Sequence, residues 1–344
     1  MSDVAKWKVH GAVETLRTEF ATWDLDQQDW QPGRHLTLTS FRPDGTISST
    51  ETHNPDGSIV RSQWLYNDAN RLIESNSWFN DGPTNKTVYF YDEAGRYIRT
   101  THLNDDGTQI DSEICTYDSD GKKTKMCVVP VLEGYVSYGI EGTKHSYGAP
   151  GVRTMTTTYD EQDLPTKVLF QGANHNPVMY VTLVRDSVGT LLSEEMHLGG
   201  ESPFLDLLEQ VPLEDREKTA AMLKKAFGDT FSSTTYTYDA QSRLIEQMDR
   251  MGSLGECRTT YRYDDHDDPI EETSEHRHRE ANADENGAMQ YTSDRLNVQH
   301  NRFEYVYDTH GNWTELIVSI QSEPNTDFQR SNIERRVITY HAGS

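Results

Sequence analysis

Apolar and aromatic side chains in this chain recur at every second position in short runs, which is the period of a β-strand. Many of these runs end in two rings that lie two residues apart: Trp64/Tyr66, Tyr89/Tyr91, Tyr236/Tyr238, Tyr261/Tyr263 and Tyr305/Tyr307. Residues two apart on a strand share a face, so every second strand should present two rings on one side of the sheet. Cross-strand packing is one interpretation of this tyrosine stripe, and a stacking platform for sugars or bases is the other.

A turn signal follows each run. Asn54-Pro55-Asp56-Gly57 has the residues of a type I turn, with proline where φ is preset and glycine where φ is positive. The same pattern begins at residues 92, 104, 118, 186 and 308, and degenerate copies begin at 67, 160, 239 and 264. From Arg42 the turns start at 42, 54, 67, about 80, 92, 104 and 118, at intervals of about 12 to 14 residues. This spacing predicts a β-meander and is too short for a two-helix repeat or a propeller blade.

Successive turns of a meander alternate between the two edges of the sheet, so the Tyr-Asp turns should share one rim. Their intervals are mostly about 25 residues, but three are longer by about 17, 28 and 19 residues. The extra chain replaces the opposite turn in each case, which predicts three insertions on the other rim, at about 131–151, 199–230 and 279–296. The second insertion has helical spacing and a proline suited to a first helical turn at Pro203. A cap or plug on the sheet and an exposed partner-docking helix are the two interpretations of that segment.

The turn motif Tyr-Asp-x-x-Gly-Arg/Asn followed by an apolar residue resembles the YD-repeat (RHS-repeat) family. Residues 91–98 and 307–313 match it well, and residues 66–73 and 238–245 match it less well. The chain looks like small stand-alone YD-repeat proteins of soil bacteria, which implies a bacterial source. In large members of the family the repeats form a shell around a toxin or another domain. This chain is much shorter than those shells and shows no core junction or C-terminal toxin. We therefore do not expect one chain to enclose another domain.

We predict one domain over residues 1–344, with an all-β fold of about twenty antiparallel strands. The meander of YD-type hairpins should form a curled or closed sheet, such as a barrel or shell, because large flat sheets twist and expose edges. A helical insertion near 199–230 should cover one opening. An N-terminal hairpin of roughly 11–23 and 33–41 should begin the sheet.

Net charge and cysteine content indicate which classes of binding partner and which cellular location to expect. The net charge of −24 disfavours nucleic acid and anionic lipid, and makes a cationic partner conceivable. The three cysteines, Cys115, Cys127 and Cys257, form neither a disulfide framework nor a zinc knuckle. No apolar signal segment and no apolar run long enough to span a membrane are present, so a reduced, cytoplasmic location is expected.

Two loops hold the candidate site residues. The first insertion is aromatic and glycine-rich, and a ligand could bind Tyr135, Tyr138, His145 and Tyr147. At the third insertion His276 and His278 share a strand face, and His300 lies beyond it, so these three could bind a metal; surface or packing histidines are the alternative. Asp118 to Gly121 resembles the start of a calcium loop but lacks the later ligands.

No nucleotide-binding, nucleophile-elbow or metalloprotease motif is present, and no cofactor is expected. The leading hypothesis is therefore a non-enzymatic binding or scaffold protein that acts through the insertion rim or the concave sheet face. A metal-binding protein or enzyme with a site around His276, His278 and His300 is a second hypothesis. A chaperone or immunity-like partner of a basic protein is a third.

Overall fold

The computed structural model describes most of the chain as β-strands and the turns between them. The described residues are 9–31, 33, 35–80, 82, 84–129, 136–140, 143–147, 152–172, 175–199, 230–252, 255–283, 289–323 and 326–342. For the described residues within 128–147 and 279–294, the description covers backbone and strand pairing alone. The predicted helical insertion near 199–230 lies, apart from its two ends, outside the described residues.

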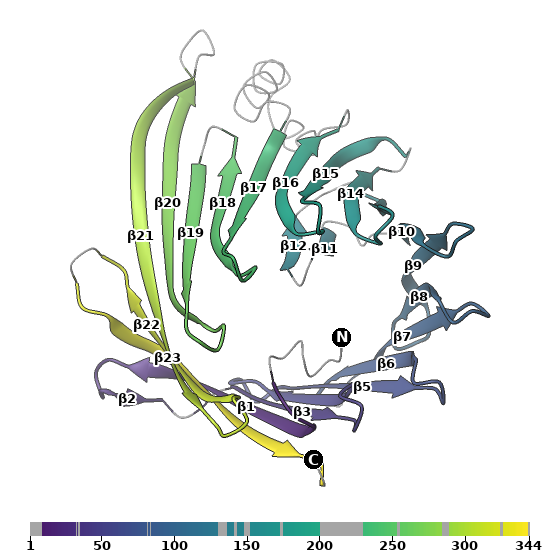
Figure 1. Ribbon diagram of the computed structural model, residues 1–344, viewed down its shortest axis with the longest axis horizontal. Coiled ribbons are helices and arrows are strands. Elements are labelled where there is room, and N and C mark those ends of the chain that lie inside the picture. Colours follow the sequence, from purple (N-terminus) through teal and green to yellow (C-terminus); the bar gives the residue numbers. More distant parts are fainter. Residues whose placement is uncertain are drawn as a thin grey trace.

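Twenty antiparallel strands form a closed barrel (Figure 1). Those of the first half of the chain are β1 (Val13–Asp24), β3 (His35–Phe41), β4 (Ile47–His53), β5 (Ile59–Tyr66), β6 (Leu72–Phe79), β7 (Thr84–Tyr91), β8 (Tyr97–Leu103), β9 (Gln109–Tyr117) and β10 (Lys123–Val129). Those of the second half are β13 (Thr154–Tyr159), β14 (Pro165–Gln171), β15 (Pro177–Arg185), β16 (Leu191–Leu198), β17 (Thr230–Tyr238), β18 (Leu244–Met251), β19 (Gly255–Tyr263), β20 (Pro269–Ala283), β21 (Met289–Tyr307), β22 (Trp313–Gln321) and β23 (Gln329–Tyr340). A short strand, β2 (Asp29–Trp30), pairs with the end of β1, and β11 (Val136–Ile140) and β12 (Thr143–Tyr147) form a separate hairpin.

The barrel closes between the first and last strands of the chain. Leu16 on β1 pairs with Thr39 on β3 on one side and with Ile338 on β23 on the other. The predicted N-terminal hairpin is confirmed as β1 and β3, and of the two predicted outcomes, curled or closed, the sheet is closed. Closure leaves no edge strand in the ring, which removes the template on which exposed edges aggregate.

The turns have the geometry that their residues predict. At Asp92 the Gly95 amide donates to the Asp92 carbonyl at 2.9 Å, and the Asp92 amide donates to the Arg96 carbonyl at 3.0 Å. This is a type I turn followed by a left-handed residue, and Gly95 has a φ of 80°. In the degenerate copies the left-handed position is taken by Asn70, Asp163, Ser242 and Asp267, with φ between 59° and 64°. The Asp92 carboxylate accepts a bond from the Arg96 amide at 2.8 Å, which explains why aspartate begins the motif.

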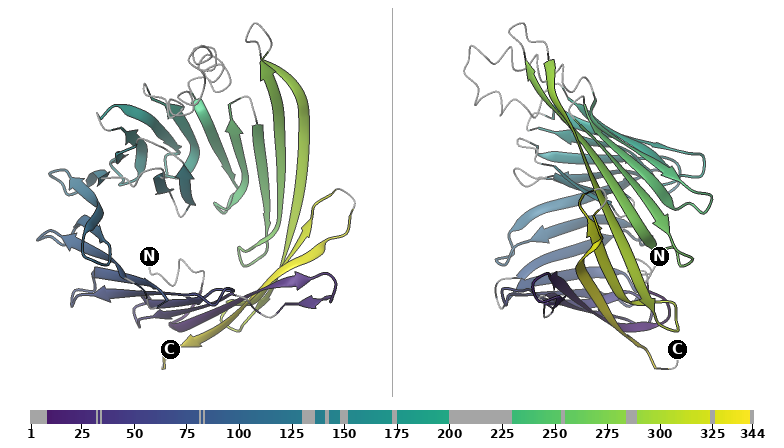
Figure 2. Two further views of the ribbon diagram at one scale, coloured as in Figure 1. Left: turned by 180° about the vertical axis from the view of Figure 1, so that it is seen from behind. Right: turned by 90° about the vertical axis from the view of Figure 1, so that its left-hand side faces the viewer.

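The connections divide into two rims, as predicted, and the side view in Figure 2 shows them at the two ends of the barrel. We call one end the Tyr-Asp rim; its turns begin at residues 42, 67, 92, 118, 160, 186, 239, 264 and 308. The strand order places the strand ends that flank the three insertions at the opposite end, here the insertion rim. These are the end of β10 and the start of β13, the end of β16 and the start of β17, and the end of β20 and the start of β21. Much of the third insertion extends the β20–β21 hairpin, whose pairing continues to Ala283 and Met289.

The register assigns one face of every strand to the inside of the barrel. Residues that pair across neighbouring strands lie on the same face of the sheet, and this face continues around the whole ring. It carries the paired aromatic residues of the tyrosine stripe. The opposite face carries exposed apolar side chains such as Val306 and Val337 together with ion pairs such as Arg258–Glu246. The first face is therefore the inner wall and the second is the outer wall.

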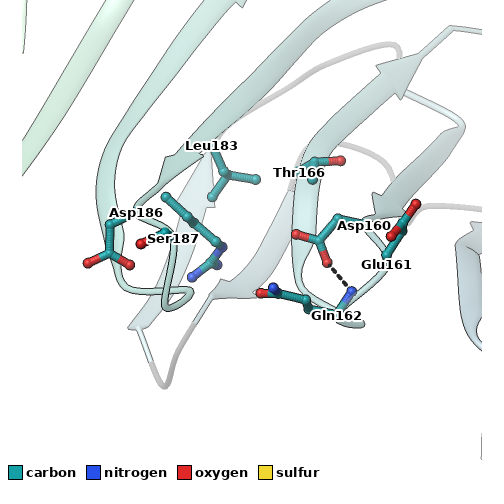
Figure 3. A pocket seen from close by; sticks show the side chains of 8 residues that line it. Asp160, Glu161, Gln162, Thr166, Leu183, Asp186 and Ser187 are labelled. Carbon is teal, nitrogen blue, oxygen red and sulfur yellow. Dashed lines mark hydrogen bonds between the residues drawn. The ribbon is translucent and has the colours of Figure 1, made fainter.

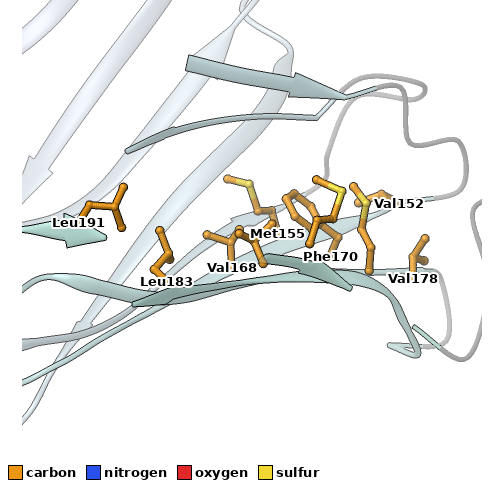
Figure 4. Close-up of a cluster of buried hydrophobic side chains, with 10 residues drawn as sticks. Val152, Met155, Val168, Phe170, Val178, Leu183 and Leu191 are labelled. Atoms are coloured by element: carbon orange, nitrogen blue, oxygen red, sulfur yellow. The ribbon is translucent and has the colours of Figure 1, made fainter. Parts of the chain in front are cut away.

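Two apolar clusters lie on the inner wall. The larger one spans β13 to β16 (Figure 4), and its members Phe170 and Val181 are almost fully buried. The smaller one lies at the closure, where Val9 packs against Val13, Leu16 and Phe41. The two clusters cover the inner wall at β1 and β3 and at β13 to β16. The rest of the inner wall is rich in serine and threonine.

Candidate functional site

Tyrosine hydroxyls link neighbouring hairpins along the Tyr-Asp rim. In each case the donor is the tyrosine that directly precedes a turn. The acceptor is a backbone carbonyl of the hairpin before it on the same rim, at the first residue of that hairpin's second strand. Four bonds of this kind recur: Tyr66 to Ile47 at 2.8 Å, Tyr91 to Leu72 at 2.7 Å, Tyr117 to Tyr97, and Tyr263 to Leu244 at 2.7 Å. Each bond connects one repeat to the next, across a sequence separation of 19 or 20 residues.

A cation lies over the face of each of these four rings and over that of Tyr159, which precedes the next turn. The pairs, with the distance from the cation to the ring centroid, are Arg42–Tyr66 at 4.5 Å, Arg71–Tyr91 at 5.8 Å, Arg96–Tyr117 at 4.7 Å, Lys123–Tyr159 at 4.4 Å and Arg243–Tyr263 at 5.0 Å. Arg243 also donates to Asp239 at 2.7 Å and to Asp267 at 3.0 Å. We call these tyrosines and cations the rim ladder. Because its rings and hydroxyls contact the chain itself, the ladder supports the packing interpretation of the tyrosine stripe.

The ladder changes composition at the turn that begins at Asp186. Arg185 stands where seven other turns of this rim have tyrosine and the turn at Arg42 has Phe41. In the turn that begins at Asp160, Leu164 stands at the position that Arg71, Arg96 and Arg243 take in their turns. A cavity of about 340 Å³ lies between this turn and the turn at Asp160 (Figure 3). Its lining comprises Asp160, Glu161, Gln162, Thr166, Leu183, Arg185, Asp186 and Ser187.

The ladder changes again at the last two turns of the Tyr-Asp rim, where the arginine is replaced by Asp268 and by Asn312. Tyr307 donates to Asp268 at 2.9 Å, and Asn312 donates to Tyr340 at 2.8 Å. Histidines stack on these rings instead of arginines: His266 on Tyr307 at 4.1 Å and His310 on Tyr340 at 4.3 Å between ring centroids. A second cavity, of about 520 Å³, lies here and is lined by both histidines, His10, Trp313, Gly311 and three aspartates.

At mid-height the inner wall is lined by hydroxyl groups in cross-strand pairs. Thr37 and Thr52 lie 3.1 Å apart, Ser62 and Ser77 2.9 Å, and Thr259 and Ser274 3.3 Å between their oxygen atoms. Towards the insertion rim the wall is open to solvent, since the inward-facing side chains Phe79 and Met251 are 58% and 49% exposed. Barrels of sixteen or more strands are wide enough to enclose an aqueous lumen, and this accessibility agrees with that geometry.

Three carboxylates on the inner wall have neutral hydrogen-bond partners, although the inner-wall carboxylate of Glu334 is paired with Arg336 at 3.5 Å. Inside, Glu113, Asp249 and Glu272 accept hydrogen bonds from the neutral side chains of Tyr97 at 3.2 Å, Thr234 at 2.7 Å and Asn301 at 2.9 Å. Outside, carboxylates are paired with cations: Glu51 with Arg61, Glu74 with Lys86, Glu246 with Arg258, Glu271 with Arg262 and Glu315 with Arg335. At these three inner positions, therefore, the hydrogen-bond partner leaves the negative charge uncompensated.

The structure separates the three predicted metal ligands. His276 and His278 share the inner wall, as their spacing predicts, but His300 pairs with Thr273 and therefore faces outward. The Nδ1 atom of His300 lies 2.9 Å from the Thr273 hydroxyl. Within the part of the chain that the structure describes, no group of three or more His, Cys, Asp or Glu side chains could hold a metal ion.

The register brings a different residue to His276. Cys257 lies directly opposite on β19, with its Sγ atom 3.8 Å from Nε2 of His276. Burial, together with the charges of Asp249 and Glu272, raises the pKa of the Cys257 thiol. A raised pKa keeps the thiol protonated at neutral pH, which is the reverse of what a cysteine nucleophile needs. The sequence did not reveal this pair because cross-strand register decides it.

The predicted aromatic site is only partly described. Tyr135 lies outside the described residues. Tyr138, His145 and Tyr147 lie on the β11–β12 hairpin, where Tyr138 pairs with His145 and Tyr147 with Val136. The hairpin brings their backbones together, and the ligand-binding role remains a prediction. Among the described residues no helix is long and apolar enough to cross a membrane.

No protein-family model matches the chain, and no curated protein matches it. Among solved structures, it is similar to the TcdB2-TccC3-Cdc42 complex, at 11% identity and a TM-score of 0.34 over 91% of this chain and 15% of that one. TcdB2-TccC3 without its hypervariable C-terminal region gives 12% identity and a TM-score of 0.35 over 93% and 16% of the two chains. A porin-like protein from Bacteroides uniformis gives 9% identity and a TM-score of 0.36 over 95% and 98%. These likenesses carry no argument about function.

Proposed function

We propose that this protein is a non-enzymatic binding module that holds a cationic ligand, such as a basic polypeptide segment, against the inner wall of its barrel. One observation carries the proposal: the inner carboxylates of Glu113, Asp249 and Glu272 take hydrogen bonds from neutral groups. A ligand with several positive charges would supply the missing counter-charge. The net charge of −24 would draw such a ligand to the barrel from solution.

The inner wall also suits a polar chain. Paired hydroxyls at mid-height can exchange hydrogen bonds with a bound backbone, and the solvent-exposed inner side chains towards the insertion rim offer an entrance. The motifs of the Tyr-Asp rim resemble YD repeats, and we propose that the chain is a small member of that family. Large members enclose another domain, which agrees with a role for the inner surface.

The experiment compares two double variants with the same change in charge. Asp249→Asn with Glu272→Gln removes inner carboxylates, and Glu246→Gln with Glu315→Gln removes outer ones. Binding of a fluorescent oligolysine peptide is measured by anisotropy at low and moderate salt. We expect the inner variant to weaken binding at least about tenfold and the outer variant to change it less than about twofold. An equal loss of peptide affinity in both variants would show that only the overall surface charge matters. A native protein that does not bind the peptide would disprove the proposal.

A metal-binding function at the insertion side of the inner wall is a second candidate, favoured by the 3.8 Å approach of Cys257 to His276. Cys257 and His276 would supply two ligands, and the described residues place no third ligand beside them. Titration with Co²⁺ tests this, because thiolate coordination gives a charge-transfer absorption band that Cys257→Ala should abolish and His300→Gln should leave unchanged. A native protein without that band would exclude the site.

A further inference from the structure

The rim ladder provides an internal template for the cavity beside Arg185. In the regular repeats a phenol ring fills the space between two neighbouring turns, and its hydroxyl reaches a strand-initial carbonyl, as Tyr263 reaches Leu244 at 2.7 Å. A guanidinium covers the ring, as Arg243 covers Tyr263 at 5.0 Å. In four repeats, therefore, this position is filled by a tyrosine whose hydroxyl donates to the strand-initial carbonyl.

Arg185 occupies the tyrosine position but leaves it partly empty. Its Nε atom lies 3.5 Å from the carbonyl of Pro165, which is the strand-initial acceptor that a ladder tyrosine would use. Its Nη1 atom donates to the Gly189 carbonyl at 2.9 Å, which draws the side chain towards its own turn. The cavity of about 340 Å³ adjoins this side chain and falls in the size range of small-molecule sites.

The lining of the cavity selects a ring with a positive charge. Leu183 provides an apolar wall, and the planar guanidinium of Arg185 can stack on an aromatic ring. Three carboxylates, those of Asp160, Glu161 and Asp186, outnumber the one cation. The backbone amide of Gln162 donates to Oδ1 of Asp160 at 2.8 Å, so the turn fixes the position of that carboxylate.

We propose that this cavity is a binding site for a small phenolic amine, whose ring takes the place of the missing ladder tyrosine and whose ammonium group faces the three carboxylates. The site lies on the Tyr-Asp rim and does not depend on the function proposed for the inner wall.

The test uses tyramine as the cationic phenol, p-cresol as its neutral analogue and 4-hydroxyphenylacetate as its anionic analogue, with binding followed by ligand-observed NMR. We expect tyramine to bind with a Kd on the order of 1 mM, the range for a ligand of this size, and to bind more tightly than p-cresol. The anionic analogue should bind most weakly. An absence of tyramine binding at about ten times that concentration, or tighter binding of the anionic analogue, would overturn the proposal.

The decisive variant is Arg185→Tyr, which restores the ladder residue and fills the cavity from within. We expect tyramine binding to weaken at least about tenfold while the melting temperature stays the same or rises. Arg262→Tyr makes the same chemical change on the outer wall and should leave tyramine binding unchanged. Native affinity in Arg185→Tyr, in a protein that melts cooperatively, would place the ligand elsewhere and refute the assignment.

Discussion

The hydroxyl of Tyr263 at the end of β19 donates to the carbonyl of Leu244 at the start of the neighbouring strand β18, at 2.7 Å. The tyrosine belongs to one hairpin and the carbonyl to the one before it, so the bond joins consecutive repeats. The aspartate that follows the tyrosine holds its own turn, and the arginine of the preceding turn covers the ring. The Tyr-Asp motif is therefore a device for both closing a hairpin and attaching it to its neighbour.

Removing one ladder hydroxyl should cost measurable stability. Tyr263→Phe keeps the ring under Arg243 and leaves the Leu244 carbonyl without its side-chain donor. We expect the free energy of unfolding in urea to fall by about 1 kcal/mol. Tyr89→Phe is the control, because that hydroxyl lies at a distant 3.5 Å from Ser75, and it should change stability by less than about 0.5 kcal/mol. A larger loss in the control than in Tyr263→Phe would contradict the role of the ladder bond.

Glycines at the left-handed turn position should differ in their tolerance of alanine. Gly311 and Gly107 have φ of 78° and 81°, and no atom lies within 4 Å of the place that an alanine methyl group would take, so alanine meets only backbone strain of about 1–2 kcal/mol. At Gly95 the methyl group would lie within 1.8 Å of the Arg71 guanidinium, which must leave its ladder position over Tyr91. We therefore expect Gly95→Ala to lower the melting temperature more than Gly311→Ala or Gly107→Ala. Equal melting temperatures for all three and the native protein would count against the turn geometry.

The turn aspartates should make the fold sensitive to acid. The backbone amides of Arg96 and Arg243 donate to Asp92 and Asp239, and these bonds hold the pKa of each carboxyl below its usual value of 3.8. A carboxyl whose pKa is lower in the folded state stabilises the protein above its unfolded pKa, and this contribution disappears as the pH falls through the folded pKa. The melting temperature should therefore fall below about pH 4, and less steeply in Asp239→Asn. An identical acid profile in that variant would exclude Asp239 as a contributor.

Sequence spacing sufficed for the parts of this fold that depend on neighbouring residues. The turn beginning at Asp92 and the shared face of His276 and His278 follow from the local pattern, and the alternation of turns predicted which strand ends share a rim. The turn near residue 80 was less regular than expected, since Asn80 itself takes the positive φ of 53°.

Relationships between distant strands could not be read from spacing. The pairing of Leu16 with Ile338 depends on the curvature accumulated over the whole ring. The outward direction of His300 and the approach of Cys257 to His276 depend on cross-strand register, which a shift of one residue would reverse. Arg185 did carry a signal, because it interrupts an otherwise regular series of tyrosines before aspartate.

The amide of Asn312 should decide whether the chain start stays attached to the barrel closure. Asn312 is fully buried and bonds with both backbone groups of His10: its Oδ1 accepts from the His10 amide at 2.6 Å, and its Nδ2 donates to the His10 carbonyl at 3.0 Å. Nδ2 also donates to the Tyr340 hydroxyl on the last strand at 2.8 Å. One side chain thus connects the start of the chain, the turn at Asp308 and the end of β23.

Asn312→Ala removes all three bonds and leaves a cavity in a buried position. We expect the unfolding free energy to fall by about 2–4 kcal/mol, because the buried Asn312 side chain is lost and the backbone groups of His10 lose their partners. Amide exchange of residues 9–12 should accelerate well before that of the central strands, since the change frees the chain start before it opens the ring. Asn301→Ala is the comparison, because it removes a partly buried amide that bonds Glu272 on the inner wall, and it should leave exchange at residues 9–12 unaltered. Equal acceleration throughout the barrel in Asn312→Ala would show that the amide supports the whole ring and does not act as a local clamp.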